Sequence, residues 1–155
     1  MLRLIPAPLH RVGYRIAHAL RVRWWRLRRP EIRGCRVLAV DGDGRILLIR
    51  HSYGSDRWML PGGELARDED ALAAAKRELR EETGCRLLEG RVIARIVEPL
   101  HSARNRLTVV GGRTEDTPRA DGREIVAAEF FALDSLPEPR AEGLGRFLER
   151  WLTAD

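Results

Sequence analysis

The sequence has few cysteines and no long uninterrupted apolar stretch. Its two cysteines, Cys35 and Cys85, cannot form a disulfide framework, and there is no CxxC pair or Cys/His nucleophile arrangement. We therefore expect each cysteine to be a small buried residue of a protein in the reducing cytosol. Arginines interrupt the N-terminal stretch every few residues, which excludes a transmembrane helix. Residues 4–9 are too short and proline-broken for a secretory signal, so we expect the protein to stay inside the cell.

Acidic residues are nearly absent from the first 34 positions. That stretch carries nine arginines against Glu31 alone, a net charge of +8. Because the whole chain carries +5, the remainder is left with about −3. A slightly acidic body suits a domain that gathers carboxylates around a cation, and it argues against nucleic-acid binding over the whole surface. The length of 155 residues favours one enzyme-sized domain.

Three glutamates share one flank of a predicted helix within residues 63–85, GELARDEDALAAAKRELREETGC. Glu78, Glu81 and Glu82 stand at i, i+3 and i+4, so their carboxylates crowd together. Like charges at this spacing weaken a helix, and a hard divalent cation that takes oxygen ligands is the simplest reason to keep them there. The sequence therefore predicts a magnesium site, with manganese as the alternative ion.

A stretch such as RELREE is more often a solvated helix face laced with ion pairs than a metal site. The glycines and acidic residues that flank this stretch decide between the two interpretations. Gly63 allows the backbone to approach a ligand closely, residues 68–70 are expected to give the helix an acidic first turn, and Gly84 is placed to end it in the left-handed conformation. A glycine loop, a helix and a C-terminal glycine cap in this order favour the metal site over a solvated helix face.

The whole stretch fits the pattern G-x5-E-x7-R-E-U-x-E-E-x-G-U, in which U is a bulky apolar residue. Chance would meet these positions with a probability of roughly one in a million. The stretch resembles the Nudix box, and the resemblance extends over about residues 35–151 because the late strand at 124–131 is also similar. It implies that Glu69 and Arg77 form a structural ion pair that braces the loop, and that Gly63 joins the metal ligands.

The predicted elements agree with the α/β/α sandwich and mixed β-sheet that this resemblance implies. Strands are predicted by alternating or continuous apolar residues, and a closing amphipathic helix follows them. The predicted strands are 36–40, 45–50, 91–97, 107–111 and 125–132, and the closing helix is 141–152.

The resemblance implies a pyrophosphohydrolase. The expected reaction is metal-dependent hydrolysis of a diphosphate linkage in a nucleoside diphosphate joined to another moiety, by attack of water at phosphorus. Glu78, Glu81 and Glu82 would be ligands, and one of them a candidate base. Glu124, or else Glu129, would complete the metal site. Weaker candidates for the base are Glu98, Glu115 and Asp121. The alternative is a non-catalytic nucleotide- or RNA-binding module on the same scaffold, which we expect to have lost box carboxylates.

Substrate contacts are predicted on the loop before the box. Arg50 and Arg57 flank this loop, where forked guanidinium groups would reach phosphate oxygens. Tyr53 is the preferred residue for stacking on a base, and Phe131 is another candidate, whereas Trp58 is expected in the core. The general base and the exact substrate stay open at this stage.

The first 33 residues are predicted to form a separate basic extension to a domain of residues 34–155. Val12, Ile16 and Leu20 recur at helical spacing with arginines on neighbouring faces, and Trp24 and Trp25 end this basic amphipathic helix. The helix either packs on the domain or on a second subunit, giving a homodimer, or contacts RNA or an anionic membrane surface. The protein is thus expected to be cytoplasmic or peripheral at the membrane. Deleting residues 1–29 is expected to leave catalysis on small substrates largely unchanged.

Overall fold

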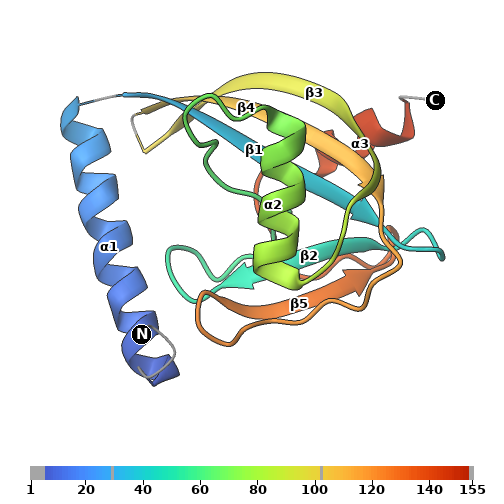
Figure 1. Ribbon diagram of the computed structural model, residues 1–155, viewed down its shortest axis with the longest axis horizontal. Coiled ribbons are helices and arrows are strands. Elements are labelled where there is room, and N and C mark those ends of the chain that lie inside the picture. Colours follow the sequence, from blue (N-terminus) through green and yellow to red (C-terminus); the bar gives the residue numbers. More distant parts are fainter. Residues whose placement is uncertain (1–5, 29, 102, 154–155) are drawn as a thin grey trace.

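A computed structural model describes residues 6–28, 30–101 and 103–153 (Figure 1). Arg3 and Arg29 of the predicted basic extension lie outside the described residues. The elements in chain order are α1 (Ala7–Arg28), β1 (Glu31–Val40), β2 (Ile46–His51), α2 (Ala71–Thr83), β3 (Leu88–Leu100), β4 (Ala103–Arg113), β5 (Ile125–Phe131) and α3 (Leu144–Leu152).

The five strands form one mixed sheet in the order β3-β4-β1-β2-β5. Strands β1 and β4 run parallel, whereas the other three neighbouring pairs are antiparallel. Helix α2 lies across one face of this sheet and α3 across the other (Figure 1). The predicted α/β/α sandwich with a mixed sheet is therefore confirmed.

The core divides into two layers because successive side chains of a strand point to opposite faces. On one side of β1, Val37 and Ala39 pack with Ala75 and Leu79 of α2. On the other side, Leu38 packs in a second cluster that includes the apolar residues of α3. Both cysteines are free and buried in the α2 layer, in agreement with the sequence.

The segment between Trp58 and Leu65 lies between β1 and β2. Those two strands pair with each other only where Val40 meets Ile46, in the part of the chain that is described. Beyond that point, Met59 exchanges two backbone hydrogen bonds with Ile49 of β2. On the other side, the carbonyl of Gly63 accepts from the backbone amide of Cys35 in β1 at 2.9 Å. The glycine-containing loop is thus fixed to the centre of the sheet.

Both ends of α2 are closed by backbone capping. The carboxylate of Asp70 accepts hydrogen bonds from two amides of the first turn, and Gly84 ends the helix at φ +76° with its amide bonded to the carbonyl of Arg80. The prediction of an acidic first turn at residues 68–70 is wrong, because the helix begins at Ala71, after all three of these residues. Asp70 is the cap, Asp68 adopts a left-handed φ of 64°, and the Glu69 side chain turns back to the loop.

Several elements are longer than the apolar patterns predicted. Strands β1 and β4 extend toward their N-terminal ends through exposed residues such as Arg33 and Arg104. A strand at the surface of a sheet tolerates these long charged side chains, so they lengthen the strand instead of ending it. Helix α1 likewise continues to Arg28, past the tryptophan pair that was expected to end it.

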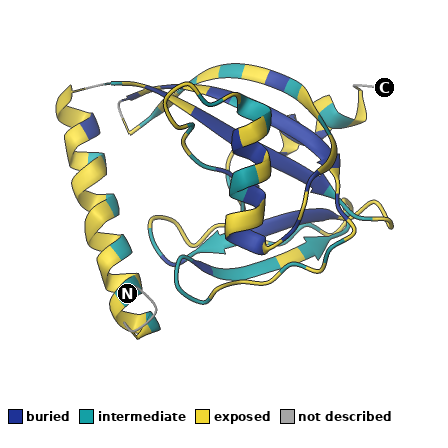
Figure 2. Cartoon of the chain, in the orientation of Figure 1, coloured by how far each residue is buried: buried dark blue, intermediate teal, exposed yellow. Residues whose placement is uncertain are grey.

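Helix α1 stands beside the sheet and enters β1 directly (Figure 1). Its inner face carries the less exposed residues, which recur every three or four positions: His10, Tyr14, His18, Val22 and the buried Trp25. Its outer face is exposed along its whole length (Figure 2). Among the helices formed by the described residues, none has the length and apolar character needed to cross a membrane.

Candidate active site

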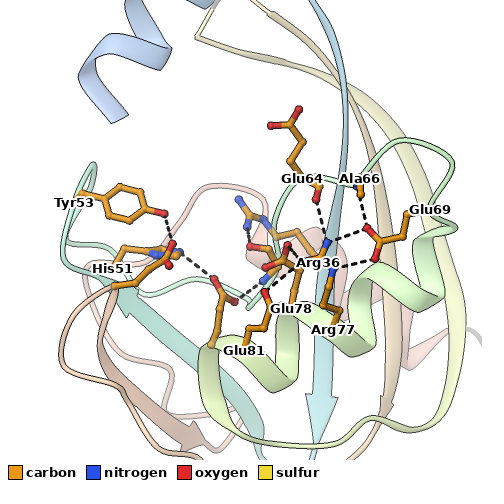
Figure 3. A network of polar contacts seen from close by, with 12 residues as sticks. Arg36, His51, Tyr53, Glu64, Ala66, Glu69, Arg77, Glu78 and Glu81 are labelled. Carbon is orange, nitrogen blue, oxygen red and sulfur yellow. Dashed lines mark hydrogen bonds and ion pairs between the residues drawn. The ribbon is translucent and has the colours of Figure 1, made fainter. Parts of the chain in front are cut away.

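Glu82 is the most buried member of the carboxylate row on α2. The residue is 8% exposed, and its Oε2 accepts a hydrogen bond of 2.8 Å from the backbone amide of Gly62. Burial raises the pKa of Glu82 to about 8, against the opposing influence of that amide and of Arg36. Glu78 is half-buried and its pKa is also raised by burial, whereas Glu81 is exposed. The row therefore descends from solvent into the protein along one flank of α2 (Figure 3).

Gly63 makes room for one of these carboxylates. A Cβ at this position would lie 2.5 Å from Oε1 of Glu78 and 2.8 Å from its Oε2. The loop backbone and the Glu78 side chain thus touch in a way that only glycine permits. This close approach gives a physical reason for glycine at the first position of the box.

Arg77 holds the outer part of the row together. Its guanidinium group forms a fork with the carboxylate of Glu69, with both nitrogen–oxygen distances at 2.9 Å. Its Nη1 also lies 2.7 Å from Glu78 and 3.3 Å from Glu81 (Figure 3). The hydrogen bond from Arg77 is the main reason that the pKa of Glu69 falls to about 2. The ion pair that the box resemblance implied is present in the structure, and Glu69 also accepts from the amide of Ala66 in the loop.

A neutral histidine lies beside Glu82 at the inner end of the row. The Nε2 of His51 is 3.7 Å from Oε1 of Glu82, and both side chains are nearly enclosed. Burial lowers the pKa of His51 to about 4, with Arg36 and His18 adding to the effect. At neutral pH the imidazole is therefore uncharged, and its contact with Glu82 is not an ion pair. Arg36 donates from Nη1 to the carbonyl of Gly62 at 3.2 Å (Figure 3).

Glu124 reaches the same region from the loop before β5. Its Oε1 accepts a hydrogen bond of 2.8 Å from the hydroxyl of Tyr53. Burial first, and then the nearby charge of Glu124, raise the pKa of Tyr53 well above its ordinary value. The same charge contributes to the raised pKa of Glu78 and of Glu82. The structure thus brings Glu124 near the box carboxylates, whereas Glu129 is exposed on β5.

A cavity of about 650 Å³ opens in front of the glycine loop. Its floor includes Gly62 and Gly63, and its side includes Tyr53. Its opposite wall is the inner face of α1. The arginines predicted to bind substrate lie elsewhere: Arg50 lines a neighbouring cavity of about 350 Å³, and Arg57 lines neither of these two cavities. Arg57 is instead 3.7 Å from Glu142. Glu98, Glu115 and Asp121, the weaker candidates for the base, line neither cavity.

Helix α1 is attached to the domain at both of its ends. Arg11 donates two hydrogen bonds to the carbonyl of Gly122, at 2.8 and 2.9 Å, and Arg15 donates one to the carbonyl of Ser52. At the other end, Trp25 is buried against Ile32 and Ala103. A helix held in this way as a cavity wall argues against the expectation that residues 1–29 are dispensable for catalysis.

The carboxylate row on α2 presents its oxygen atoms as possible ligands for a metal ion. Glu78, Glu81 and Glu82 offer only hard oxygen donors, and the carbonyl of Gly63 uses one lone pair on Cys35 and keeps the other. No three acidic, histidine or cysteine side chains stand close enough to enclose an ion, as far as the described chain extends. In this structure, the guanidinium group of Arg77 forms ion pairs with both Glu78 and Glu81. The donor set fits magnesium, provided that these carboxylates turn from Arg77 toward the cavity.

Four residues of the site were not foreseen from the sequence. Arg36 and Asn105 sit among apolar residues of β1 and β4, His51 ends β2, and His18 lies on α1. The one feature of the sequence that could have identified Arg36 and Asn105 as site residues is that each is a polar residue within a pattern of alternating apolar residues. The positions of His18 and His51 depend on how α1 folds back over the sheet, which local pattern does not specify.

Comparisons with known proteins agree with the geometry. The sequence model of the family described as NUDIX domain matches residues 30–151. Among solved structures, the MutT NUDIX hydrolase from Burkholderia pseudomallei superposes with a TM-score of 0.70 at 28% identity, covering 77% of this chain and 97% of that one. The MutT protein from Methanosarcina mazei Go1 shares the fold, with a TM-score of 0.71, 24% identity, and coverage of 82% of this chain and 96% of that one.

Curated relatives match over a shorter region. An RNA pyrophosphohydrolase of Teredinibacter turnerae (strain ATCC 39867 / T7901) is 36% identical over 58 residues, which are 37% of this chain and 34% of that protein. The diphosphoinositol polyphosphate phosphohydrolase 3-alpha of Mus musculus is 34% identical over 59 residues, 38% of this chain and 36% of that protein. The match thus spans about a third of the length of these relatives. The family model covers far more of the chain, and the chain belongs to the Nudix hydrolase family.

Proposed function

We propose that this protein is a metal-dependent pyrophosphohydrolase that cleaves a diphosphate linkage in a nucleotide-type substrate by attack of water at phosphorus. The observation that carries the proposal is the carboxylate row of α2, in which Glu82 and Glu78 contact the glycine loop, whose Gly62 and Gly63 line a cavity of about 650 Å³. The names of the similar proteins, an RNA pyrophosphohydrolase and a diphosphoinositol polyphosphate phosphohydrolase, both denote hydrolysis at a phosphate group. Their shared chemistry supports the reaction class.

Each residue of the row has a proposed role. Glu78, Glu81 and Glu82, with the carbonyl of Gly63 and with Glu124, would hold magnesium or manganese. A bound divalent cation would neutralise phosphate charge and make a water molecule a better nucleophile. A carboxylate with a raised pKa is suited to accept the proton of that water near neutral pH, and the pKa of Glu82 is about 8.

Glu69, Arg77 and Gly84 are proposed to act on structure and not on substrate. The fork between Arg77 and Glu69 ties the loop to α2, and Gly84 closes the helix. Tyr53 is proposed as a substrate contact because it lines the cavity. Arg50 is kept as a phosphate contact at the neighbouring cavity, whereas Arg57 would have to leave Glu142 to take part.

The experiment that tests the activity is a panel of nucleoside triphosphates, ADP-ribose-type compounds and 5′-triphosphorylated RNA, each with magnesium or manganese. Release of phosphate, pyrophosphate or nucleoside monophosphate is expected from at least one class and is expected to stop with chelator. In water enriched with heavy oxygen, the label is expected on a phosphate product. Label found only on a sugar hydroxyl would contradict attack at phosphorus. A non-catalytic binding module would release no product from any class, although its box carboxylates are all present here.

For the extension and its location, we propose that α1 also contacts an anionic membrane surface, in a protein that otherwise resides in the cytoplasm. The outer face of α1 exposes a stripe of large apolar side chains, namely Leu9, Val12, Ile16, Leu20, Trp24 and Leu27. The helix contains several arginines and no acidic residue. Apolar insertion combined with arginine–phosphate attraction is the chemistry of interfacial helices.

Vesicle flotation tests this contact. Salt-sensitive binding to vesicles that contain phosphatidylserine is expected, and Ile16→Glu combined with Leu20→Glu is expected to abolish it. Binding to RNA instead of vesicles, or a homodimer that dissociates in the double variant, would assign the stripe to those partners and overturn the membrane proposal.

A further inference from the structure

The smaller cavity, of about 350 Å³, lies along the seam between α1 and the end of β2. Arg11 and Arg15 line it from α1 and Arg50 lines it from β2, while Asp56 is the acidic member of the lining. Among the residues that the structure describes, none of the three arginines has a carboxylate partner. Arg11 and Arg15 donate to backbone carbonyls, and Arg50 lies over the ring of Trp58 at 5.3 Å. Three guanidinium groups against one carboxylate make this cavity suited to an anion.

The hydroxyl group of Ser52 is buried in the wall of the same cavity and lacks a hydrogen-bonding partner. The residue is 8% exposed, and its Oγ bonds to no residue that the structure describes. Both backbone groups of Ser52 are used, because its amide donates to the carbonyl of Glu124 at 2.8 Å and its carbonyl accepts from Nε of Arg15 at 3.2 Å. The residue is thus held in place while its hydroxyl stays unpaired. A buried hydroxyl beside an excess of positive charge is suited to donate to a bound anion.

This cavity is separate from the one in front of the glycine loop. His51 and Tyr53 line both cavities and form part of their common wall, with ring centroids 5.0 Å apart (Figure 3). Of these two cavities, Gly62 and Gly63 line only the larger, whereas Ser52 lines only the smaller. An anion beside Ser52 would therefore lie apart from the glycine loop and from the diphosphate that the carboxylate row is proposed to cleave.

The three arginines belong to two parts of the molecule. Arg11 and Arg15 stand at i and i+4 on α1, whereas Arg50 belongs to the sheet. Like charges at that spacing weaken a helix, and their approach to a third guanidinium group opposes the docking of α1 on the domain. An anion between them would offset both repulsions. Because such an anion binds more tightly when α1 is docked, its binding must in turn stabilise the docked position of α1.

We propose that this seam is a phosphate-binding site, in which Arg11, Arg15, Arg50 and Ser52 hold a phosphate group that locks α1 onto the domain. The inference goes beyond the proposed hydrolysis, because binding at the seam needs neither the metal nor a diphosphate bond. Guanidinium groups and a hydroxyl group are donors that match the oxygens of a phosphate ion or a phosphate monoester. The volume of about 350 Å³ suits a small ligand. Since α1 is also a wall of the larger cavity, phosphate would control how firmly that cavity is closed.

Calorimetric titration of the full-length protein with inorganic phosphate, in chelator and at constant ionic strength, tests the site. Saturable binding of phosphate is expected. Ser52→Ala is expected to weaken this binding about 10-fold and to leave the melting temperature without phosphate unchanged, because the hydroxyl has no partner in the described protein. Arg15→Gln is expected to weaken it about 10-fold or more. Arg23→Gln is the matched control, since Arg23 lines neither cavity, and it is expected to bind like the wild type.

Hydrogen exchange measures the lock on α1. Saturating phosphate is expected to slow exchange of the α1 amides about 10-fold in the wild type and to leave the α2 amides unchanged. The effect is expected to be lost in Ser52→Ala at the same phosphate concentration. Vesicle flotation distinguishes the source of the phosphate group, because phosphatidic acid carries a phosphate monoester on a lipid. Stronger flotation with phosphatidic acid than with phosphatidylserine, lost in Ser52→Ala, would identify a lipid headgroup, whereas equal flotation would identify the free ion.

Three results would overturn the proposal. The first is an equal affinity for phosphate in the wild type, Ser52→Ala and Arg15→Gln. The second is phosphate binding that Glu82→Gln abolishes, which would place the ion at the carboxylate row. The third is exchange in α1 that phosphate does not slow. A failure to hydrolyse any diphosphate would instead overturn the proposed function and leave this site standing.

Discussion

Helix α1 lines the cavity in front of the glycine loop and α2 contacts that loop through Glu78 and Glu82, but the two helices are held in different ways. Helix α2 is capped at both ends, packs one face on the core through residues such as Leu79, and presents its carboxylates from a fixed backbone. Helix α1 has one buried residue, Trp25, and is otherwise attached by side-chain hydrogen bonds to surface carbonyls and by ring contacts such as that of Tyr14 with Tyr53. The proposed metal ligands therefore belong to the rigid element, and the cavity wall belongs to an element whose detachment would leave most of the core intact.

The sharpest test of the role given to α2 is Glu82→Gln. Glutamine keeps an oxygen for the amide of Gly62 but lacks the charge needed to ligate a cation, so turnover is expected to fall about 1000-fold or more. Melting temperature in chelator is expected to hold or rise, because the substitution removes a buried carboxyl group whose charged form is disfavoured by burial. Steady-state kinetics and circular dichroism measure both quantities, with Glu149→Gln on α3 as the control. Near-wild-type activity of the Glu82 variant would remove the metal site from α2.

Trp25→Ala tests the role given to α1. Loss of the buried indole is expected to detach that end of the helix and to raise KM about 10- to 100-fold, with a smaller change in kcat. Trp24→Ala is the matched control, because Trp24 is 53% exposed on the outer face of the same helix. The two variants need comparison on one nucleotide substrate. An unchanged KM for Trp25→Ala would show that α1 is not part of the substrate site.

Gly63→Ala tests the contact between the loop and the carboxylate row. The added methyl group would meet the end of the Glu78 side chain, which is flexible enough to move aside. We therefore expect kcat to fall about 10-fold or more, while the melting temperature changes by a few degrees at most. The comparison with Gly42→Ala is informative because a Cβ at Gly42 meets nothing within 4 Å. If the Gly63 variant unfolds instead, the loop matters for the fold more than for the position of Glu78.

The smallest effect is expected from Glu69→Gln, on stability. The pKa of Glu69 is lowered in the folded protein to about 2, so its contribution is present above the unfolded value near 4.5 and disappears as pH falls through about 2. The variant is expected to melt a few degrees below the wild type at pH 7, and the gap is expected to close in acid. Glu142→Gln, whose side chain is 94% exposed, is expected to melt like the wild type at both pH values. A gap that persists at pH 2 would exclude the ion pair as its cause.

The two helices also differ in how much of them could be predicted from sequence. Spacing placed the carboxylates on one flank of α2, and Gly84 marked its end, because both depend on local geometry. The start was misplaced by three residues, since an acidic residue such as Asp70 can serve equally as a cap or as a first-turn residue until its φ and ψ are known. For α1 the pattern indicated a helix but not its partner. Its contact with Tyr53, far along the chain, depends on tertiary packing that periodicity does not encode.

Arg77 gives the protein a resident countercharge. Its guanidinium group already contacts Glu69, Glu78 and Glu81, so one positive charge offsets part of their negative charge before any ion arrives. Entry of a divalent cation would then be an exchange, in which Glu78 and Glu81 pass from Arg77 to the metal while Glu69 keeps the arginine in place. Affinity for the ion would then depend on how much more strongly Glu78 and Glu81 bind the metal than they bind Arg77, and not on the full attraction between the row and the metal. Folding would consequently be independent of metal supply, and the metal could leave and return without loss of structure.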